Sequence, residues 1–512
     1  MRAVDERGHF DGPREISVWR YAVKAMDTLN GTRRGFLREL AAGSGVILAG
    51  CNRASAPAAG TATSTAVADT SAADLTLRIA PVVADIAKDH SISTIGYNGQ
   101  VPGPLIRLQE GKTVTVDLFN DTEAPEFVHW HGQVIPADLD GAPEEKSLAV
   151  LPHDHVRYRL TPQPSGARFV HSHVMSMADL NRGTYTGQFG FVYIEPKNHP
   201  GQYDQEVFLA THEWEPTFSA EEEMEDEDIT AEEKERKEDQ DKKSKPNGWE
   251  IGYQRFTING KALGYGDPVR VKEGQRVLFH LLNGSATENI QLALPGHQFQ
   301  VVALDGNPVP HPQMVEVLDL GTAERISAVV EMKNPGVWIL GTPHDDDRKN
   351  GMGIVVEYAN RNGAPRWIKP AHKAWDYTIF GDTKPVPDPV EMITLAIGKI
   401  NGGKGGFNRW TFNGKSFDEK DTPRALQKGK RYRLVIDNQT DDPHPVHLHR
   451  NSFELTNVYG KATSGVIKDV VLIKGFRKVA VDFAPAMEGL TLFHCHQQFH
   501  MDYGLKTLFN VV

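Results

Sequence analysis

The stretch Thr113-Val114-Thr115-Val116-Asp117-Leu118 decides the fold, because its pattern returns twice later in the chain. Successive side chains of a β-strand point to opposite faces, so alternation of this kind predicts a strand with one buried face. The same period occurs in Arg276-Val277-Leu278-Phe279-His280-Leu281 and in Arg431-Tyr432-Arg433-Leu434-Val435-Ile436. Three strands of one type indicate a repeated unit.

The residues around these strands repeat as well. Each strand lies between an Asn-Gly turn and an Asn, and that Asn stands nine residues after a second Gly. The three sets are Asn98-Gly99, Gly111 and Asn120; Asn259-Gly260, Gly274 and Asn283; and Asn413-Gly414, Gly429 and Asn438. Repeats of this size decide architecture, so from Leu75 onward we expect three copies of one domain.

Composition agrees with an all-β body. The 512 residues are too many for one core, and 47 Gly, 31 Pro and 39% hydrophobic residues accompany many short β-prone runs. We therefore predict three consecutive Greek-key β-sandwiches, which we call the first, second and third copies. Their expected ranges are 75–197, 198–372 and 373–512.

The charge pattern excludes one class of partner. A net charge of −11 argues against nucleic acid, because phosphate binding needs a basic surface. The second copy is interrupted at residues 221–245, a run that is nearly all charged. Such a run cannot bury a core, so we expect a solvated helix or a disordered loop, with a metal-collecting role as the functional alternative.

The N-terminus is typical of an exported protein. Thr32-Arg33-Arg34-Gly35-Phe36-Leu37 precedes an apolar run and resembles a twin-arginine signal, so residues 1–50 are interpreted as a leader handled by the twin-arginine export machinery. Cys51 follows Leu48-Ala49-Gly50, as at a lipoprotein processing site, which would anchor the chain by acyl groups. Residues 51–74 are interpreted as a low-complexity linker. Ordinary signal-peptidase cleavage in its Ala/Ser/Thr-rich run, Ala54 to Ala73, is the alternative to lipid attachment, and Met26 is an alternative start.

No later segment has the roughly 20 apolar residues that span a bilayer, so we expect the remainder to be soluble. The expected location is the periplasm or the cell surface.

Four His-x-His pairs carry the chemistry. Residues two apart on a strand point the same way, so each pair presents two imidazoles to one point. If the first and third copies pack together, eight imidazoles converge, enough for a cluster of several metal ions. The pairs are His129/His131, His171/His173, His447/His449 and His494/His496.

Cys495 identifies the metal. Alternation turns it to the opposite face from His494 and His496, where it must serve a second site. His444 and His500 are the available partners, and two His with one Cys are the donors of a blue-copper centre. Only one other cysteine occurs, Cys51, so a disulfide framework is excluded.

These motifs resemble the four copper motifs of the multicopper oxidases, the laccase-like superfamily, over nearly the whole chain after Leu75. The resemblance implies cupredoxin-like domains and about four copper ions. It also implies a type 1 copper at His444, Cys495 and His500, and a type 2 copper at His129 and His447. The type 3 pair would then be bound by His131, His171, His173, His449, His494 and His496. Asp140 stands where the family carries an acidic residue that assists proton delivery, although a plain Asp-Gly turn is an alternative interpretation.

The sequence departs from the family at several places. Leu505, ten residues after Cys495, replaces an axial Met and cannot coordinate the metal. Met501 stands where a proton-relay Glu is frequent, and Arg450 and Asn451 replace a Gly and a His. In the second copy Gly341, Thr342 and Pro343 align with the ligand positions, so this copy is expected to bind no copper and to act as a spacer that shapes the substrate cleft.

The expected activity is oxidation of a small reducing substrate, with dioxygen reduced to water. Phenols or other organic one-electron donors, as in laccases, are the first choice. A metallo-oxidase acting on Cu(I), Fe(II) or Mn(II) is the alternative, although no Met-rich segment is evident. Copper nitrite reductase is disfavoured because His flanks Cys495 on both sides, and a non-enzymatic scaffold is disfavoured because all eleven ligand positions are filled.

Overall fold

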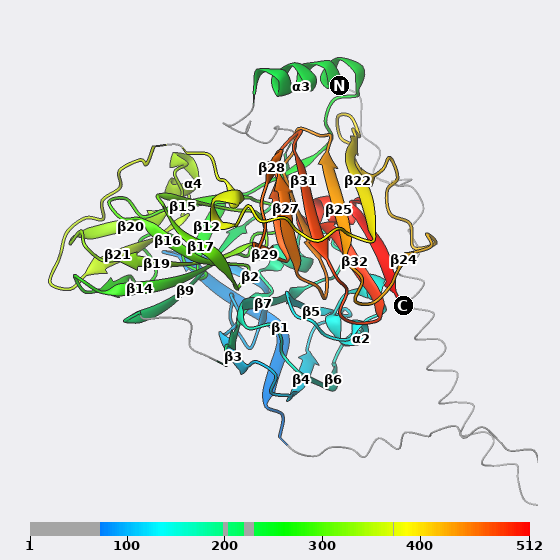
Figure 1. The fold of residues 1–512 in the computed structure, drawn as a ribbon. Helices are drawn as coiled ribbons and strands as arrows, with labels where there is room; N and C mark the ends of the chain where they lie inside the picture. Colours follow the sequence, from blue (N-terminus) through cyan, green and yellow to red (C-terminus); the bar gives the residue numbers. More distant parts are fainter. Residues whose placement is uncertain (1–71, 198–202, 220–229, 372) are drawn as a thin grey trace, which may run out of the picture. The chain divides into compact units, whose positions relative to one another are not determined.

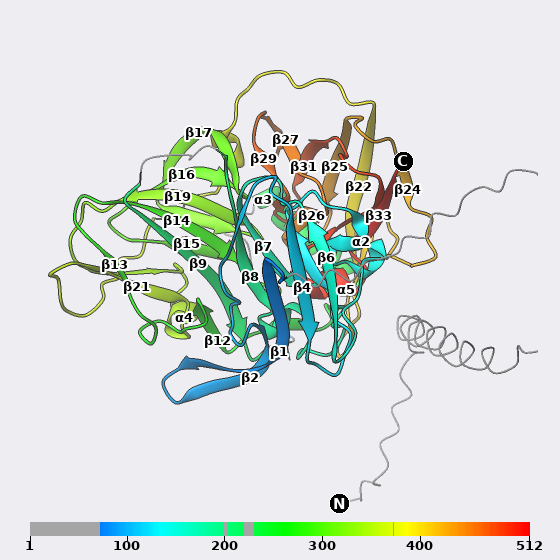
Figure 2. The ribbon, with the colours of Figure 1, turned by 90° about the horizontal axis from the view of Figure 1, so that it is seen from below.

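The computed structural model describes residues 72–197, 203–219, 230–371 and 373–512. The leader, Cys51 and residues 221–229 of the acidic run lie outside the described residues. Within the described part of the chain, no helix combines the length and the apolar character needed to cross a membrane. The strands form three successive pairs of sheets, which can be followed by label in Figures 1 and 2.

The first copy contains two four-stranded sheets. In spatial order these are β2 (His90–Tyr97), β1 (Leu75–Ala87), β4 (Val114–Asn120) and β6 (Asp154–Leu160), and then β3 (Ile106–Gln109), β8 (Phe189–Glu195), β7 (Gly166–Ser172) and β5 (Val128–His131). Apolar residues of both sheets meet in one core, for example Leu77 and Val116 against Val170 and Val192. Short helical turns lie between strands: α2 (Ala137–Asp140), η1 (Pro143–Glu145) and η2 (Gly183–Thr186).

The second copy has a six-stranded and a five-stranded sheet. Their orders are β12 (Arg255–Ile258), β9 (Gln205–Trp214), β14 (Arg276–Asn283), β19 (Arg325–Glu331), β16 (Phe299–Leu304) and β17 (Asn307–Val315), and then β13 (Val269–Val271), β21 (Gly353–Tyr358), β20 (Val337–Gly341), β15 (Ile290–Ala293) and β18 (Val317–Leu320). A separate ribbon pairs β10 (Thr217–Ser219) with β11 (Glu250–Gly252), and α4 spans Asp345–Lys349.

The third copy repeats the plan. One sheet contains β23 (Arg409–Phe412), β22 (Glu391–Ile400), β25 (Tyr432–Asn438), β31 (Lys478–Phe483), β27 (Phe453–Val458) and β28 (Lys461–Ala462), with β29 (Ile467–Lys468) beside β27. The other contains β24 (Arg424–Leu426), β33 (Lys506–Val511), β32 (Gly489–Cys495), β26 (His444–Leu448) and β30 (Val470–Ile473). The helical turns are η3 (Tyr377–Phe380) and α5 (Gln498–Asp502). The predicted fold class, three consecutive sandwiches, is confirmed.

The repeated Asn-Gly turns make the same contacts three times. Asn98, Asn259 and Asn413 have positive φ angles of 51°, 53° and 53°, a conformation that Asn tolerates well. Each side-chain oxygen accepts from one backbone N–H and each amide donates to a carbonyl of the same strand, as Asn413 does with Ala396 and Thr394. These turns therefore fasten one edge of each sandwich.

The second repeated Asn positions the loops that lead to the candidate site. Asn120, Asn283 and Asn438 are fully buried at the ends of β4, β14 and β25. Each donates to a carbonyl of the following loop and accepts from a backbone N–H two residues on, for example from Thr440 at 3.0 Å. Because the loops lead into β5, β15 and β26, these asparagines fix where those strands begin.

The acidic run contains a helix, α3 (Ala231–Lys243), that begins with a capping box between Thr230 and Glu233. The expectation of a solvated helix agrees with α3, in which Glu233 is the only buried residue, although one side of the helix contacts the third copy. Glu233 pairs with Arg477 at 2.8 Å, and the side chain of Gln240 donates to the carbonyl of Gln439 at 2.9 Å. Opposite charges on the two surfaces explain the docking.

Candidate metal centre

The four His pairs lie on, or directly after the ends of, two pairs of adjacent antiparallel strands. In the first copy, β5 ends in His129 and His131, and β7 leads into His171 and His173. His129 lies directly opposite His171 in the strand register. In the third copy the same relation places His447 of β26 opposite His494 of β32. Pairing of equivalent strands therefore brings each His pair beside another.

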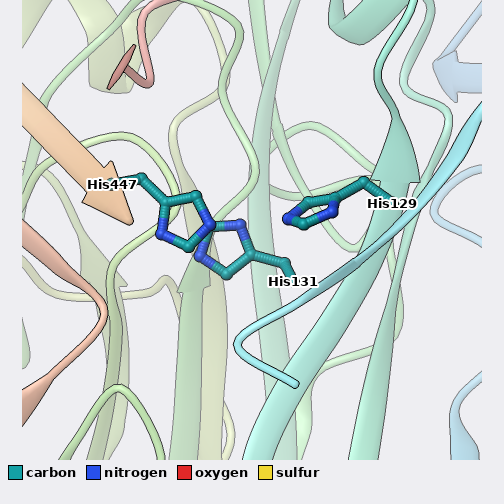
Figure 3. A group of neighbouring side chains, drawn as sticks. All are labelled: His129, His131 and His447. Carbon is teal, nitrogen blue, oxygen red and sulfur yellow. The ribbon is translucent and has the colours of Figure 1, made fainter. Parts of the chain in front are cut away.

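The eight imidazoles meet between the first and third copies, as the alternation predicts. Figure 3 shows the rings of His129, His131 and His447 together, and those of His131 and His447 stack at 3.8 Å. Nitrogen atoms approach closely enough to share metal ions in three groups, each of which combines histidines of both copies. The groups are His129, His131 and His447; His131, His171 and His496; and His173, His449 and His494.

The hydrogen bonds leave one nitrogen of most rings available for a metal. The Nδ1 atoms of four histidines donate to backbone carbonyls, which can only accept, so the second nitrogen keeps its lone pair. His447 donates in this way to Asp469 at 2.7 Å, and its buried Nε2 has no partner among the described residues. His129, His171 and His494 donate to Asp140, Ser172 and Cys495. The donor set therefore fits a metal cluster.

Burial keeps seven of these eight rings neutral, and ligation requires the neutral form. Removal from water lowers the pKa of His494 to about 3 and that of His131 well below its usual value. Burial, followed by the neighbouring histidines, also lowers the pKa values of His171, His173, His447, His449 and His496.

Two carboxylates contact ring nitrogens of histidines in the cluster. Asp140 lies in α2, and its Oδ2 atom is 2.7 Å from Nδ1 of His449 and 3.2 Å from Nδ1 of His129. Asp469 is the second, with Oδ1 at 3.0 Å from Nε2 of His131. Asp469 was not among the residues predicted from the sequence, although the charged pair Lys468-Asp469 inside an apolar strand run was a usable signal.

Cys495 forms a separate group on the other face of β32. Its Sγ atom lies 3.6 Å from Nδ1 of His444 and 3.7 Å from Nδ1 of His500, and the two nitrogens are 3.1 Å apart. Three donors around one point fit a trigonal copper site. Burial lowers the pKa of His444 to about 3, so its ring is neutral.

The group formed by Cys495, His444 and His500 is shielded from solvent. Cys495, His444 and His500 are 0–1% exposed, so a donor from solvent cannot touch the rings directly. The ring of His444 is held by Thr440, whose Oγ1 lies 3.0 Å from Nε2. Trp410 packs on His500 with ring centroids 3.9 Å apart.

Leu505 and Met501 are both buried. The carbonyl of Leu505 accepts from the backbone N–H of Cys495 at 3.0 Å, and the N–H of Leu505 donates to the carbonyl of His500 at 3.0 Å. These two hydrogen bonds fix Leu505 beside Cys495 and His500. Met501 lies within α5, which starts two residues after His496.

Among its described residues, the second copy has no equivalent group of His and Cys. In their sheets β20, β15 and β21 occupy the places that β32, β26 and β33 occupy in the third copy. Gly341 ends β20, and Thr342 and Pro343 follow. This equivalence of strands supports the alignment of these residues with His494, Cys495 and His496.

A narrow cavity reaches the histidine cluster between the first and second copies. Two ligand candidates, His171 and His496, contribute to its wall, and Ser285 contributes a buried hydroxyl with no hydrogen-bond partner in the described structure. The other lining residues are Phe169, Thr184, Phe189, Asn283 and Gly284.

Comparison with known proteins agrees with this geometry. Residues 80–199, 227–360 and 396–512 match three family models, each described as multicopper oxidase. The chain is 28% identical to multicopper oxidase MmcO of Mycobacterium tuberculosis, with 94% of this chain and 97% of that protein covered. It is 25% identical to a multicopper oxidase of Staphylococcus aureus over 82% of this chain and 84% of that protein. A multi-copper oxidase structure from Pseudomonas thermotolerans shares the fold, with a TM-score of 0.64, 23% identity, and coverage of 85% of this chain and 98% of that one.

Proposed function

Because this chain belongs to the multicopper oxidase family, whose members are copper-dependent oxidoreductases that use dioxygen, we propose a laccase-like activity on organic donors. Four donor molecules would each lose one electron, and four electrons with four protons would reduce one dioxygen to two waters. One observation carries the proposal. Cys495 belongs to the separate His-Cys group, while its neighbours His494 and His496 belong to the histidine cluster, so three consecutive residues at the end of β32 link both centres.

The distances support an assignment of ligands. His444, Cys495 and His500 would hold the type 1 copper, and His129 with His447 the type 2 copper. The two remaining groups, each of three histidines, would hold the type 3 pair. Bound copper supplies the one-electron steps and the site of dioxygen reduction. The eleven residues hold their donor atoms in place and exclude water, since each is at most 6% exposed.

Asp140 supports the proton part of the reaction. Its carboxylate holds Nδ1 of His449 at 2.7 Å and is itself fully buried. A carboxylate at this place can accept a proton and pass it toward the cluster. The cavity lined by His171 and His496 is the passage that we assign to dioxygen and water.

Aromatic residues beside the type 1 group favour an organic donor. Phe218, Trp249, Phe407 and Tyr503 are half-buried, and we call them the aromatic cover. The rings of Phe407 and Tyr503 are 4.8 Å apart, and Tyr503 packs on Phe499, the residue before His500. Phenols stack on such rings, and this surface brings them near the buried ligands.

Three acidic residues, Asp441, Asp442 and Glu250, lie near the His-Cys group and favour the metallo-oxidase alternative. However, little of their negative charge is free to attract a metal ion. The ammonium of Lys399 lies 3.0 Å from Asp441 and 2.6 Å from Asp442. Burial, and then the charge of Asp442, raises the pKa of Glu250 to about 8, so this carboxyl is neutral at pH 7. A cation would therefore find little uncompensated negative charge.

Oxygen consumption with phenols, Cu(I), Fe(II) and Mn(II) tests the proposed donor. We expect phenols to support turnover, and Phe407→Ala to lower kcat/KM for phenols about tenfold, the effect of losing about 1.4 kcal/mol of stacking. Phe417→Ala, a half-buried phenylalanine outside the aromatic cover, is the matched control. Turnover with the metal ions alone would replace the organic donor by the metallo-oxidase alternative.

We also propose export to the periplasm or the cell surface, with a lipid anchor at Cys51. The support is the Arg33-Arg34 motif followed by an apolar run and Cys51.

A further inference from the structure

A fully buried charged network lies beneath the histidine cluster. It contains three acidic and three basic residues, each at most 1% exposed, and its formal charge is balanced. All three copies contribute: Arg168 from the first; Asp305, Glu324 and Arg325 from the second; Lys468 and Asp469 from the third. Burial of so many charges is costly unless each is paired, so a network of this kind needs a specific reason.

Arg325 grips the carboxylate of Asp469 with two parallel hydrogen bonds. Its Nη1 donates to Oδ1 at 2.7 Å and its Nη2 donates to Oδ2 at 2.6 Å. Arg168 adds a third bond to Oδ2 at 3.1 Å. Paired bonds between guanidinium and carboxylate fix orientation as well as distance.

Asp469 in turn holds two candidate ligands. Its Oδ1 lies 3.0 Å from Nε2 of His131, and its backbone carbonyl accepts from Nδ1 of His447 at 2.7 Å. The backbone N–H groups of Asp469 and Val470 donate to the carboxylate of Asp305, at 3.2 and 3.1 Å. The second copy therefore holds both the side chain and the backbone of Asp469.

The backbone at Gly132 is packed too closely against Asp469 and Arg325 for a larger residue to fit. Gly132 follows His131, and a Cβ atom there would lie 2.6 Å from Oδ2 of Asp469 and 3.0 Å from Nη2 of Arg325. Only glycine allows the His131 strand to approach the network so closely. The close approach links the conformation of β5 directly to the Arg325–Asp469 pair.

We infer that Arg325 of the copper-free second copy is a positioning residue for the copper cluster, acting through Asp469 on His131 and His447. The second copy is thus more than a spacer. Through Asp469 it supports His447, which belongs to the type 2 site, and His131, which belongs to the type 3 pair. This inference rests on the proposed ligand assignment. The planar, two-pronged guanidinium is essential to it, because an ammonium cannot make both bonds to the carboxylate in fixed geometry.

Arg325→Lys in the full chain tests the inference, since it keeps the charge and removes the two-pronged grip. We expect loss of about half or more of the type 2 copper electron paramagnetic resonance signal, and up to one fewer copper ion per chain, while the blue absorption per chain is unchanged. Arg433→Lys is the matched control. Arg433 of β25 holds the buried Asp482 of β31 with two similar hydrogen bonds, and neither residue belongs to the charged network. If Arg325→Lys folds poorly, Arg168→Lys is the second test. It affects only one bond to Asp469, so we expect a smaller loss of the same type 2 signal.

A second readout needs no copper. In the metal-free chain labelled with nitrogen-15 at histidine, the proton on Nε2 of His131 reports its bond to Asp469, and we expect Arg325→Lys but not Arg433→Lys to shift that signal. Wild type that fails to load copper would contradict the proposed function, whereas this readout would still decide the role of Arg325. An unchanged His131 signal and an unchanged type 2 spectrum in Arg325→Lys would overturn the inference. Equal loss of blue and type 2 copper would also overturn it, because it would indicate general destabilisation.

Discussion

The carboxylate of Asp140 lies 2.7 Å from Nδ1 of His449, although 309 residues separate them in the chain. Asp140 also accepts, through its backbone carbonyl, from Nδ1 of His129 at 2.8 Å. One residue therefore contacts histidines of both the first and third copies. Because it is completely buried, its proton can come only through neighbouring groups of the protein or through enclosed water.

Asp140→Asn should slow the reoxidation of the reduced enzyme by dioxygen by at least about 100-fold, the usual contribution of a placed proton donor. The amide keeps the shape of the carboxylate, so copper content and blue absorption should persist. Stopped-flow mixing with dioxygen measures this step. Asp138→Asn, an exposed neighbour in the same helical turn, should be unaffected. A normal rate in Asp140→Asn would mean that Asp140 only caps the histidine rings.

Leu505→Met should lower the reduction potential of the type 1 copper and leave the copper content unchanged. Leucine donates no electron density to the metal, whereas a thioether would stabilise the oxidised state. Leu505 is buried and hydrogen-bonded through its backbone to Cys495 and His500, so it lies beside two residues that would hold this copper. Redox titration of the blue band measures the potential. An equal or higher potential in the variant would identify Leu505 as an ordinary core residue.

Glu288→Gln should stabilise the protein at alkaline pH and have little effect near pH 5. Burial, and then the charges of Glu213, Asp347 and Glu250, raises the pKa of Glu288 to about 8. The unfolded chain has the ordinary value near 4.5, so the folded state binds the extra proton between these pH values. This contribution to stability is complete below about pH 4.5 and is lost as the pH rises toward 8, by at most about 1.4 kcal/mol per pH unit.

Thermal unfolding of wild type and Glu288→Gln from pH 5 to pH 8.5 measures the difference, which should grow with pH. Glu316→Gln, an exposed residue of the same copy, is the control. A difference that stays constant across this range would show that Glu288 titrates normally.

Cys51→Ala should release the protein from the membrane fraction, because the acylated residue would be lost. Arg33→Lys combined with Arg34→Lys should block export through loss of the paired arginines. Cell fractionation followed by immunoblotting separates the two effects. Unchanged partitioning of Cys51→Ala would remove the proposed anchor while leaving the export prediction intact.

The sequence predicted the parts of this site that depend on strand period. A His-x-His pair on a strand must present both rings to one face, and a Cys between them must face away, whatever the rest of the chain does. The convergence of His129 with His447, and of Cys495 with His444 and His500, follows from this rule once equivalent strands pair. Repeated turns and buried asparagines made the three copies recognisable in advance.

Contacts between the copies could not be predicted in the same way. Arg168, Arg325 and Asp469 are scattered over three repeats, and nothing local shows that they share one buried network. The charged composition of α3 indicated a solvated helix, but composition does not reveal that a charged surface elsewhere matches one side of it. Glu233 finds that surface at Arg477. Long-range ion pairs therefore account for most of what sequence reasoning missed.

Copper analysis of the purified full chain, combined with its visible spectrum, is the decisive test of the proposed copper centres. We expect about four copper ions per chain and a blue absorption in wild type. In Cys495→Ser we expect loss of the blue absorption, with about three copper ions retained on the histidine cluster. A wild-type chain that holds a single copper ion, or zinc, or copper with no blue band, would contradict the proposed centres.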